Sequence, residues 1–189
     1  MMKIVCKLFI FSCMSVYSTG CGSANNKENP VTKNEVVYAC LPCGAGCDTT
    51  VYQKPGSCPH CNMELVDKST ITHKNIQSED MCKLDTGKVI FLDVRTPEEF
   101  NGSAKEKFGA IRNAVNINVE ELTARISELE NYKTSEIVVY CSHSHRSPRA
   151  SYILTQAGFK NVTNMNGGMS VWKERVKSTA CSAKLYLQQ

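Results

Sequence analysis

Aromatic side chains are scarce in this chain: 7% of its 189 residues are aromatic, and only one is tryptophan. No run of basic residues with interleaved aromatics occurs, although such stretches are typical of proteins that bind nucleic acids. The formal net charge is also small, at +4. We therefore expect no nucleic-acid partner.

Long apolar runs are missing as well. Residues 8–17 form an apolar segment that is too short to span a bilayer, because a helix needs about 20 residues for that. Lys3 and Lys7 flank the start of this segment, and residues 18–21 read STGC. This arrangement resembles a bacterial lipoprotein signal, which implies cleavage after residue 20 and a lipid on Cys21. A plain secretory signal is the alternative.

The resemblance implies a protein of the bacterial cell envelope, held at a membrane by its lipid. Residues 1–20 are then a signal peptide, and residues 21–35, which are mostly small and polar, are a tether. An uncleaved cytosolic N-terminus is the other interpretation, but it leaves an apolar segment exposed. The sequence does not indicate whether the protein forms oligomers.

Cysteine, in contrast, is abundant, with 11 residues. Four of them form two C-x2-C pairs, the spacing of structural zinc sites: Cys40, Cys43, Cys58 and Cys61. Few good core formers lie between the pairs, so a module at residues 36–66 needs a metal or another cross-link to fold. The spacing leaves open whether Cys47 is a further ligand. Disulfides are the alternative to metal, because an envelope compartment is oxidising.

Residues 38–43 (YACLPC) and 55–65 (PGSCPHCNMEL) are similar to the small heavy-metal-binding domain found beside copper-transporting ATPases and efflux adaptors. The second segment matches that domain's P-G-x-C-P-x-C-G-M-x-L pattern except at Asn62. In the first segment, Cys43 replaces the domain's histidine. A thiolate in place of an imidazole gives the expected site a stronger preference for soft metal ions. We expect zinc there, with copper(I) or another thiophilic metal as the alternative.

Short apolar runs alternate with helical patterns over the rest of the chain. Four runs are too short for helices and are expected as strands: residues 89–92, 114–117, 137–140 and about 162–165. Helical spacing occurs between residues 119 and 130, and again after Arg146 as far as Gly158. This alternation predicts an α/β fold, with a mostly parallel sheet covered by helices on both faces. We expect this domain at residues 67–177, where residues 67–80 form a linker into the sheet, and a tail at residues 178–189.

The third of these strands stops at Cys141. The polar loop that follows consists of Ser142, His143, Ser144, His145, Arg146 and Ser147. Cys141 is therefore expected at a helix N-terminus and at the carboxyl end of a parallel strand, where α/β proteins bind ligands. Free N–H groups and the helix dipole there favour the thiolate, which is the nucleophilic form of cysteine.

Four segments resemble motifs of the rhodanese family of sulfurtransferases. Residues 89–100 (VIFLDVRTPEEF) are similar to its strand and D-V-R-x-x-x-E-F motif, and residues 109–117 (GAIRNAVNI) to its G-H-I-P-G-A-x-N-I segment. The loop after Cys141 and residues 158–172, with their GG pair and tryptophan, complete the set. The resemblance implies a rhodanese-like fold in which Cys141 is catalytic, and residues 101–108 are a short insertion.

The resemblance also implies a chemistry. The Cys141 thiolate attacks the outer sulfur of a donor such as thiosulfate, holds that sulfur as a persulfide, and passes it to a thiophilic acceptor. The expected partners are thus a small sulfur donor and a thiol acceptor. Backbone N–H groups from Ser142 through Ser147 are expected to stabilise the persulfide, and no cofactor is required for the transfer.

Two arginines support this expected site. Arg146 is expected to close the loop by pairing with Asp93, although direct contact with substrate is an alternative. Arg95 either faces the site and attracts an anionic donor or pairs with Glu98 or Glu99 at the surface.

Two other functions fit parts of the pattern. A non-enzymatic scavenger of thiophilic metals or metalloids would combine Cys141, His143 and the cysteines of the N-terminal module. His143 and His145 are otherwise expected as exposed polar residues, or as groups that favour the thiolate when protonated. Cysteine phosphatases of the cell-division type have a similar layout but use C-x5-R. The C-x4-R spacing from Cys141 to Arg146 fits a sulfur-carrying cysteine better.

Overall fold

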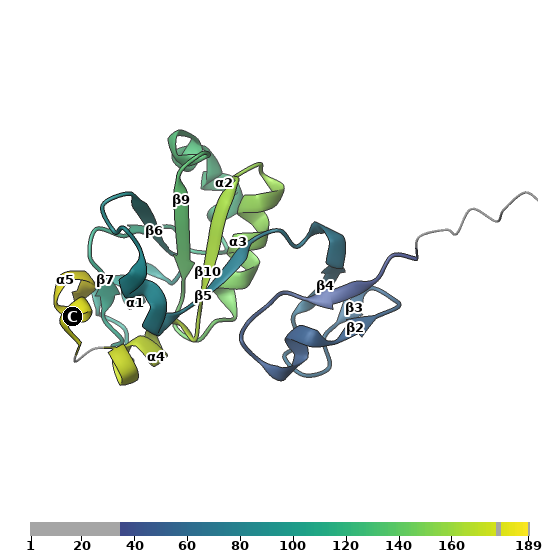
Figure 1. The fold of residues 1–189 in the computed structure, drawn as a ribbon, viewed down its shortest axis with the longest axis horizontal. Coiled ribbons are helices and arrows are strands. Elements are labelled where there is room, and N and C mark those ends of the chain that lie inside the picture. The colour runs from purple at the N-terminus through teal and green to yellow at the C-terminus, as the bar shows by residue number, and fades with distance from the viewer. Residues whose placement is uncertain (1–34, 177–178, 189) are drawn as a thin grey trace, which may run out of the picture. The chain divides into compact units, whose positions relative to one another are not determined.

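The computed structural model describes residues 35–176 and 179–188 (Figure 1). The expected signal peptide, nearly all of the expected tether and the expected lipidation site at Cys21 lie outside these residues. In the described part of the chain, no helix combines the length and the apolar character needed to cross a bilayer.

A small antiparallel sheet with the order β2-β1-β4-β3 begins the described chain. Its strands are β1 (Tyr38–Cys40), β2 (Val51–Tyr52), β3 (Gly56–Ser57) and β4 (Glu64–Asp67). A 3-10 helix at Gly46–Thr49 lies between β1 and β2. The buried cluster of this module consists of four cysteines and Leu65, so its interior contains thiols rather than an ordinary apolar core.

The main sheet has five strands in the order β5-β10-β9-β6-β8, and every neighbouring pair is parallel (Figure 1). The strands are β5 (Lys74–Gln77), β6 (Val89–Asp93), β8 (Val115–Asn116), β9 (Glu136–Tyr140) and β10 (Asn161–Asn166). The predicted α/β fold with a parallel sheet is thus confirmed. The strand that leads to Cys141, β9, is the central one.

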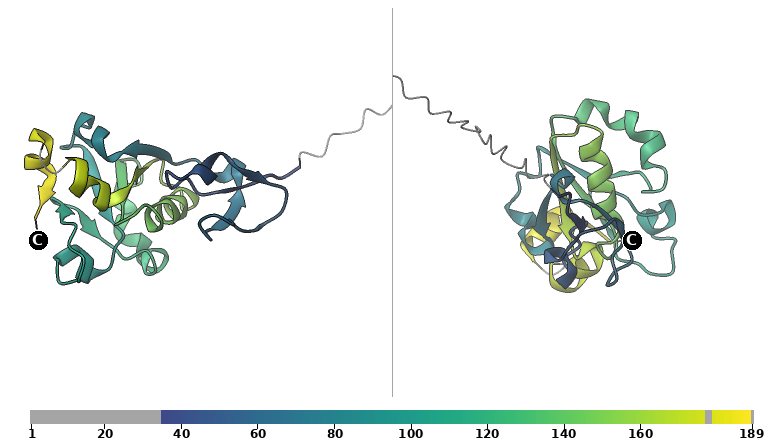
Figure 2. Two further views of the ribbon diagram at one scale, coloured as in Figure 1. Left: turned by 90° about the horizontal axis from the view of Figure 1, so that it is seen from below. Right: turned by 90° about the vertical axis from the view of Figure 1, so that its right-hand side faces the viewer.

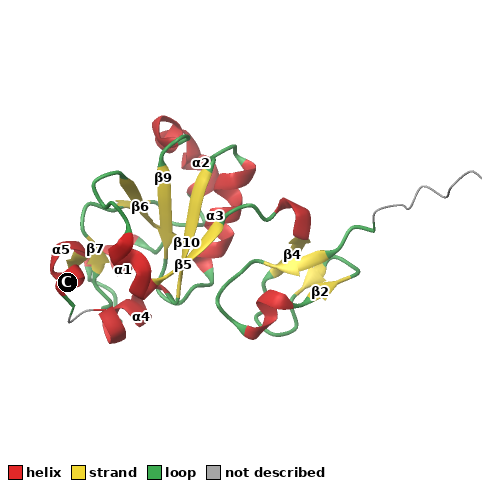
Figure 3. Cartoon of the chain, in the orientation of Figure 1, coloured by secondary structure: helices red, strands yellow, loops and turns green. Residues whose placement is uncertain are grey.

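Helices cover both faces of this sheet, as Figures 2 and 3 show. One face packs against α2 (Leu122–Arg125), which continues as a 3-10 helix at Ile126–Tyr132, and against α3 (Arg146–Gln156). The other face packs against a 3-10 helix at Ser78–Lys83, α4 (Gly168–Val171) and the π-helical turn Trp172–Val176.

Residues of β9 alternate between these two layers, because successive side chains of a strand point to opposite faces. Ile137 and Val139 belong to the cluster on the α3 side, whereas Val138 and Tyr140 belong to the cluster around Trp172. The strand is therefore buried on both faces, which holds its carboxyl end, and Cys141 after it, in a fixed position.

Two segments are more ordered than the sequence predicts. The expected linker contains β5, an edge strand of the main sheet whose sequence, KNIQ, has a single apolar residue. The expected tail contains α5 (Ala180–Leu185) and β11 (Tyr186–Leu187). The latter pairs with β7 (Ala110–Ile111), which follows α1 (Pro97–Asn101) in the chain.

Candidate active site and metal centre

Cys141 directly follows β9, and α3 begins five residues later at Arg146. Its side chain is buried, with 1% exposure, and the Sγ atom donates a hydrogen bond to Ser147 Oγ at 3.4 Å. The structure thus places the thiol at the carboxyl end of the central strand and before a helix, as expected. Burial keeps bulk water away from the sulfur, so a donor has to enter the loop to reach it.

The carbonyl groups of Cys141 and Ser142 point toward α4. The N–H of Met169 donates to the Cys141 carbonyl oxygen at 2.9 Å, and the N–H of Ser170 donates to that of Ser142 at 3.0 Å. No peptide bond in the described chain is cis. Because a trans peptide points its C=O and the following N–H in opposite directions, the N–H groups of Ser142 and His143 point away from α4.

Glycine at position 168 permits this close approach. Gly168 has a φ of +63°, in the left-handed region, and an added Cβ would lie 2.5 Å from the carbonyl oxygens of both Cys141 and Ser142. A side chain is therefore excluded on two grounds, backbone conformation and contact. The GG pair of the sequence thus has a direct structural link to Cys141.

Ser144 fastens the middle of the loop to the end of β10. It has a φ of +63°, which is uncommon for a residue with a side chain. Its Oγ accepts a hydrogen bond from the N–H of Gly167 at 3.2 Å and donates one to the carbonyl oxygen of Met165 at 3.4 Å. These two bonds hold the loop in its unusual backbone conformation.

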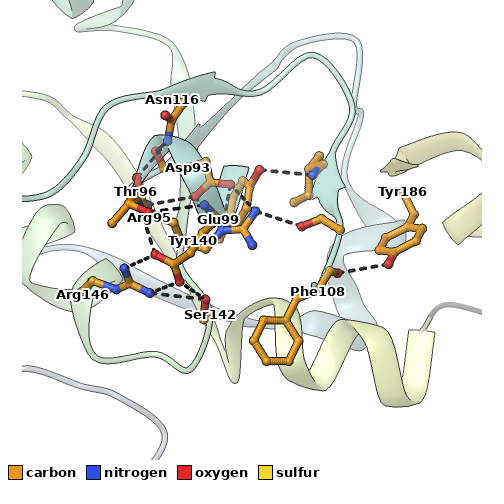
Figure 4. Close-up of polar contacts among 12 residues, drawn as sticks. Asp93, Arg95, Thr96, Glu99, Phe108, Asn116, Tyr140, Ser142, Arg146 and Tyr186 are labelled. Carbon is orange, nitrogen blue, oxygen red and sulfur yellow. Dashed lines mark hydrogen bonds and ion pairs between the residues drawn. The ribbon is translucent and has the colours of Figure 1, made fainter. Parts of the chain in front are cut away.

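Arg146 pairs with Glu99 rather than with Asp93, so the predicted partner was wrong (Figure 4). The two guanidinium–carboxylate bonds measure 2.6 and 2.7 Å, and Ser142 Oγ donates a third bond to Glu99 at 2.8 Å. Bonding to Arg146 lowers the pKa of Glu99 to about 2. The same carboxylate completes a capping box with Thr96 at the start of α1, which fixes its position.

Asp93 instead holds Arg95, and both side chains are fully buried. Arg95 Nε lies 2.9 Å from one carboxylate oxygen of Asp93 and Nη2 lies 2.6 Å from the other, and Nη2 also donates to the carbonyl of Gly109. The ring of Tyr140 lies 5.8 Å from the guanidinium carbon. The surface pairing with Glu98 or Glu99 expected for Arg95 was therefore wrong, whereas attraction of an anionic donor by Arg95 stays a prediction. A carboxylate buried at the end of β6 requires a charged partner, and Arg95 provides it.

The two loop histidines are exposed. The ring of His143 meets that of Phe108 edge to face, with 5.1 Å between their centroids. Phe108 ends the expected insertion at residues 101–108, so this segment reaches the loop. Among the described residues, neither His143 nor Cys141 belongs to a group of side chains placed to hold a metal ion.

Such a group exists in the N-terminal module. Four thiols lie with all their sulfur atoms within 4.8 Å of one another: Cys40, Cys47, Cys58 and Cys61. All are free thiols in this structure rather than disulfides. Four sulfur ligands in mutual reach suit tetrahedral zinc, and they equally suit other thiophilic ions.

The fourth member of this group is Cys47, whereas the C-x2-C spacing predicts Cys43. The 3-10 helix at Gly46–Thr49 brings Cys47 back toward the strands, and its Sγ lies 3.9 Å from that of Cys61. Cys43 instead forms a second group with Cys47 and Asp48. Cysteine spacing alone is compatible with either choice, so no signal in the sequence separates them.

The electrostatics of the four-thiol group favour a cation. Burial opposes ionisation of Cys58, but N–H groups of Cys61 and His60 donate to its sulfur and lower its pKa to about 6. Burial raises the pKa of Cys47 to about 12 and also raises the pKa of Cys40. Without an ion, the group therefore holds a thiolate at Cys58 beside the protonated thiols of Cys40 and Cys47, and a bound cation would stabilise the thiolates of these two residues.

Comparison with known families agrees with both sites. The family profile of the Rhodanese-like domain matches residues 81–175, half of the chain. The chain belongs to the rhodanese family. The profile of the Heavy metal binding domain matches residues 37–68, in front of the rhodanese domain. This range contains all five cysteines of the N-terminal module.

Curated relatives match the rhodanese domain. A mitochondrial protein of Schizosaccharomyces pombe, provisionally named a thiosulfate sulfurtransferase, is 33% identical over 52% of this chain and 75% of its own length. A protein of Allochromatium vinosum named sulfurtransferase is 32% identical over 51% of this chain and 85% of its own. The tRNA uridine(34) hydroxylase of Cytophaga hutchinsonii is 29% identical over 58% of this chain but only 35% of its own length. Relatives of the rhodanese domain thus carry more than one activity in their names.

Proposed function

We propose that this protein is a sulfurtransferase that moves sulfane sulfur from a thiosulfate-like donor to a thiophilic acceptor through a persulfide on Cys141. The observation that carries the proposal is the position of Cys141 at the end of β9 in a rhodanese domain, with the first loop carbonyls turned toward α4. The names of the two sulfurtransferase relatives support it.

The proposed reaction has two steps. The Cys141 thiolate attacks the outer sulfur of thiosulfate, the S–S bond of the donor breaks, and sulfite leaves with the bonding electron pair. An acceptor such as cyanide or a thiolate then attacks the outer sulfur of the persulfide and restores the Cys141 thiolate. The N–H groups of Ser142 and His143, which point away from α4, are available to stabilise the anionic sulfur in both steps.

The test is formation of thiocyanate from thiosulfate and cyanide by the purified full chain. We expect turnover in the wild type and none in Cys141→Ser, with circular dichroism unchanged. Ser57→Ala, a change at an exposed position outside the rhodanese domain, serves as the control and should retain turnover. Mass spectrometry after thiosulfate alone should find one extra sulfur on Cys141. Turnover in Cys141→Ser, or none in the wild type with several sulfur donors, contradicts the proposal.

We also propose that the N-terminal module binds zinc or another thiophilic ion through Cys40, Cys47, Cys58 and Cys61. The mutual distances of the four thiols and the match to the heavy metal binding domain support this. Elemental analysis of protein purified under reducing conditions should find a bound ion that is lost in Cys58→Ala. Metal-free but folded wild-type protein would contradict the site.

The alternative function, a non-enzymatic metal or metalloid scavenger, predicts that Cys141 and His143 join the cysteines of the module around one ion. The ligand groups of the described residues contain neither side chain, which favours the enzyme. The thiocyanate assay separates the two functions. A phosphatase would instead hydrolyse an aryl phosphate, and we expect no such activity.

For the location of the protein, we propose a lipid anchor on Cys21 in the bacterial cell envelope. Only the sequence pattern of residues 1–21 supports it. Labelling of cells with a radioactive fatty acid should mark the wild type and leave Cys21→Ala unlabelled. Equal labelling of both proteins, or of neither, contradicts the anchor.

A further inference from the structure

We propose that the N-terminal module binds a second thiophilic ion through Cys43, Cys47 and Asp48, with Cys47 as a ligand shared by both ions. This inference rests on the proposed four-thiol site, because the second site uses one of its ligands. The ions are d10 cations that prefer thiolates, such as zinc, cadmium or copper(I).

Proximity of the donor atoms is the first argument. One ligand atom each from Cys43, Cys47 and Asp48 lies within 4.8 Å of the others, and Cys47 also belongs to the four-thiol group. The two groups therefore meet at one sulfur atom. A thiolate has several lone pairs, so it can bridge two soft ions, whereas a side chain with one donor pair cannot.

Preorganisation of Asp48 is the second argument. Its Oδ1 accepts the N–H of Cys43 at 3.0 Å, and its Oδ2 accepts the N–H of Gly44 at 2.7 Å, so the loop holds the carboxylate in place. A carboxylate has about four acceptor positions, which leaves room for an ion. The Cys43 Sγ donates to the same Oδ1 at 3.6 Å. Binding of an ion would release this thiol proton to solvent and put the cation in its place.

Charge is the third argument. The Cys43 sulfur lies 3.6 Å from the Asp48 carboxylate, so a thiolate at Cys43 and this carboxylate would repel each other without a cation between them. A divalent cation between the two groups compensates the Cys43 thiolate and the Asp48 carboxylate together. The second ion thus adds no net negative charge to the cluster.

The number of protein ligands predicts that the second ion is bound less tightly than the first. The four-thiol site is complete without Cys43, and four ligands are typical of a structural ion. Three protein ligands at the second site leave one position open. We therefore expect this ion to be the more weakly bound and the faster to exchange.

The experiment is a titration of the reduced, metal-free full chain with 113Cd²⁺ under anaerobic conditions, followed by native mass spectrometry and 113Cd NMR. We expect two ions in the wild type and two resonances with a scalar coupling, because a shared sulfur connects the metals. Cys43→Ser should keep one ion and lose the coupling. Asp48→Asn should weaken the second ion on the order of tenfold or more. The control Cys141→Ser, which removes a thiol outside the module, should keep both ions and the coupling.

The outcomes separate this inference from the proposed four-thiol site. A single bound ion in the wild type, or two uncoupled resonances that persist in Cys43→Ser, overturns the second site and leaves the first intact. Absence of any bound ion overturns the four-thiol site itself. Retention of the first ion by Cys43→Ser and Asp48→Asn also shows that these variants fold.

Discussion

The Arg146 guanidinium binds the Glu99 carboxylate through two hydrogen bonds that join the first turn of α3 to α1. Ser142, the residue after Cys141, donates to the same carboxylate. Glu99 is thereby a common attachment point for both ends of the loop at residues 142–147, here called the catalytic loop (Figure 4). A negative charge is needed there, because an amide cannot accept from both sides of the guanidinium.

Glu99→Gln should therefore lower sulfur transfer and stability together. We expect about a tenfold loss of thiocyanate turnover, since small displacements of a nucleophile strongly reduce rate, and a loss of about 1–2 kcal/mol in the free energy of unfolding. Glu120→Gln is the matched control. Glu120 pairs with Arg149, which lies on α3 like Arg146, but this pair is exposed. Equal effects of the two substitutions would contradict the role of Glu99.

Gly168→Ala should damage the catalytic loop through its Cβ. The added atom would meet the carbonyl oxygens of Cys141 and Ser142, so the loop or α4 has to move. Gly158→Ala separates this contact from backbone strain, since Gly158 also has a positive φ, +92°, but a Cβ added there would meet no atom within 4 Å. We expect Gly158→Ala to cost about 1 kcal/mol with normal turnover, and Gly168→Ala to cost more and to reduce turnover. Both are measured by urea unfolding and the thiocyanate assay.

Much of the fold follows from local sequence patterns. The strands β6 and β9 coincide with apolar runs, because central strands of a parallel sheet are buried on both faces. In β10 only Val162 and Met165 are apolar, and the strand also buries polar side chains such as Asn164. The edge strand β5 lacks such a run, since it needs fewer apolar side chains and takes its place by pairing with β10. Its position depends on tertiary structure that a local pattern does not contain.

In the candidate sites, too, local sequence patterns predict some features and tertiary structure determines the others. Cys141 follows from the pattern of strand, loop and helix, whereas the partner of Arg146 depends on where α1 packs. Cys47 enters the four-thiol group because a 3-10 helix returns it to the strands. Cysteine spacing limits which residues can meet in space but does not choose among them.

Metal binding by the four-thiol site should be strongly pH-dependent. Cys47 and Cys40 are protonated at neutral pH because their pKa values are raised, so binding of zinc has to release at least these two protons. Two protons per ion correspond to about a 100-fold weaker affinity for each unit of pH decrease. Below pH 6, protonation of Cys58 should steepen the dependence. Competition with a chromophoric chelator at pH 6, 7 and 8 measures it, and an affinity independent of pH would refute the raised pKa values.

His73 should make the protein sensitive to acid. Its side chain is 7% exposed, neither ring nitrogen has a hydrogen-bond partner among the described residues, and burial lowers its pKa to about 4. The unfolded chain, with an ordinary histidine pKa of about 6.5, binds a proton that the folded chain rejects between these two values. Stability is therefore complete above pH 6.5 and falls as the pH drops toward 4.

Urea unfolding of the metal-free protein at pH 7.5 and 4.5 tests this dependence. The wild type should lose about 2–3 kcal/mol from His73 between these pH values, whereas His73→Leu should lack this contribution. The exposed His60 provides the control, because His60→Gln should retain the full wild-type loss. Since other groups titrate in all three proteins, the difference between the variants isolates His73. An identical loss in His73→Leu and the wild type would show that the buried imidazole does not set the acid sensitivity.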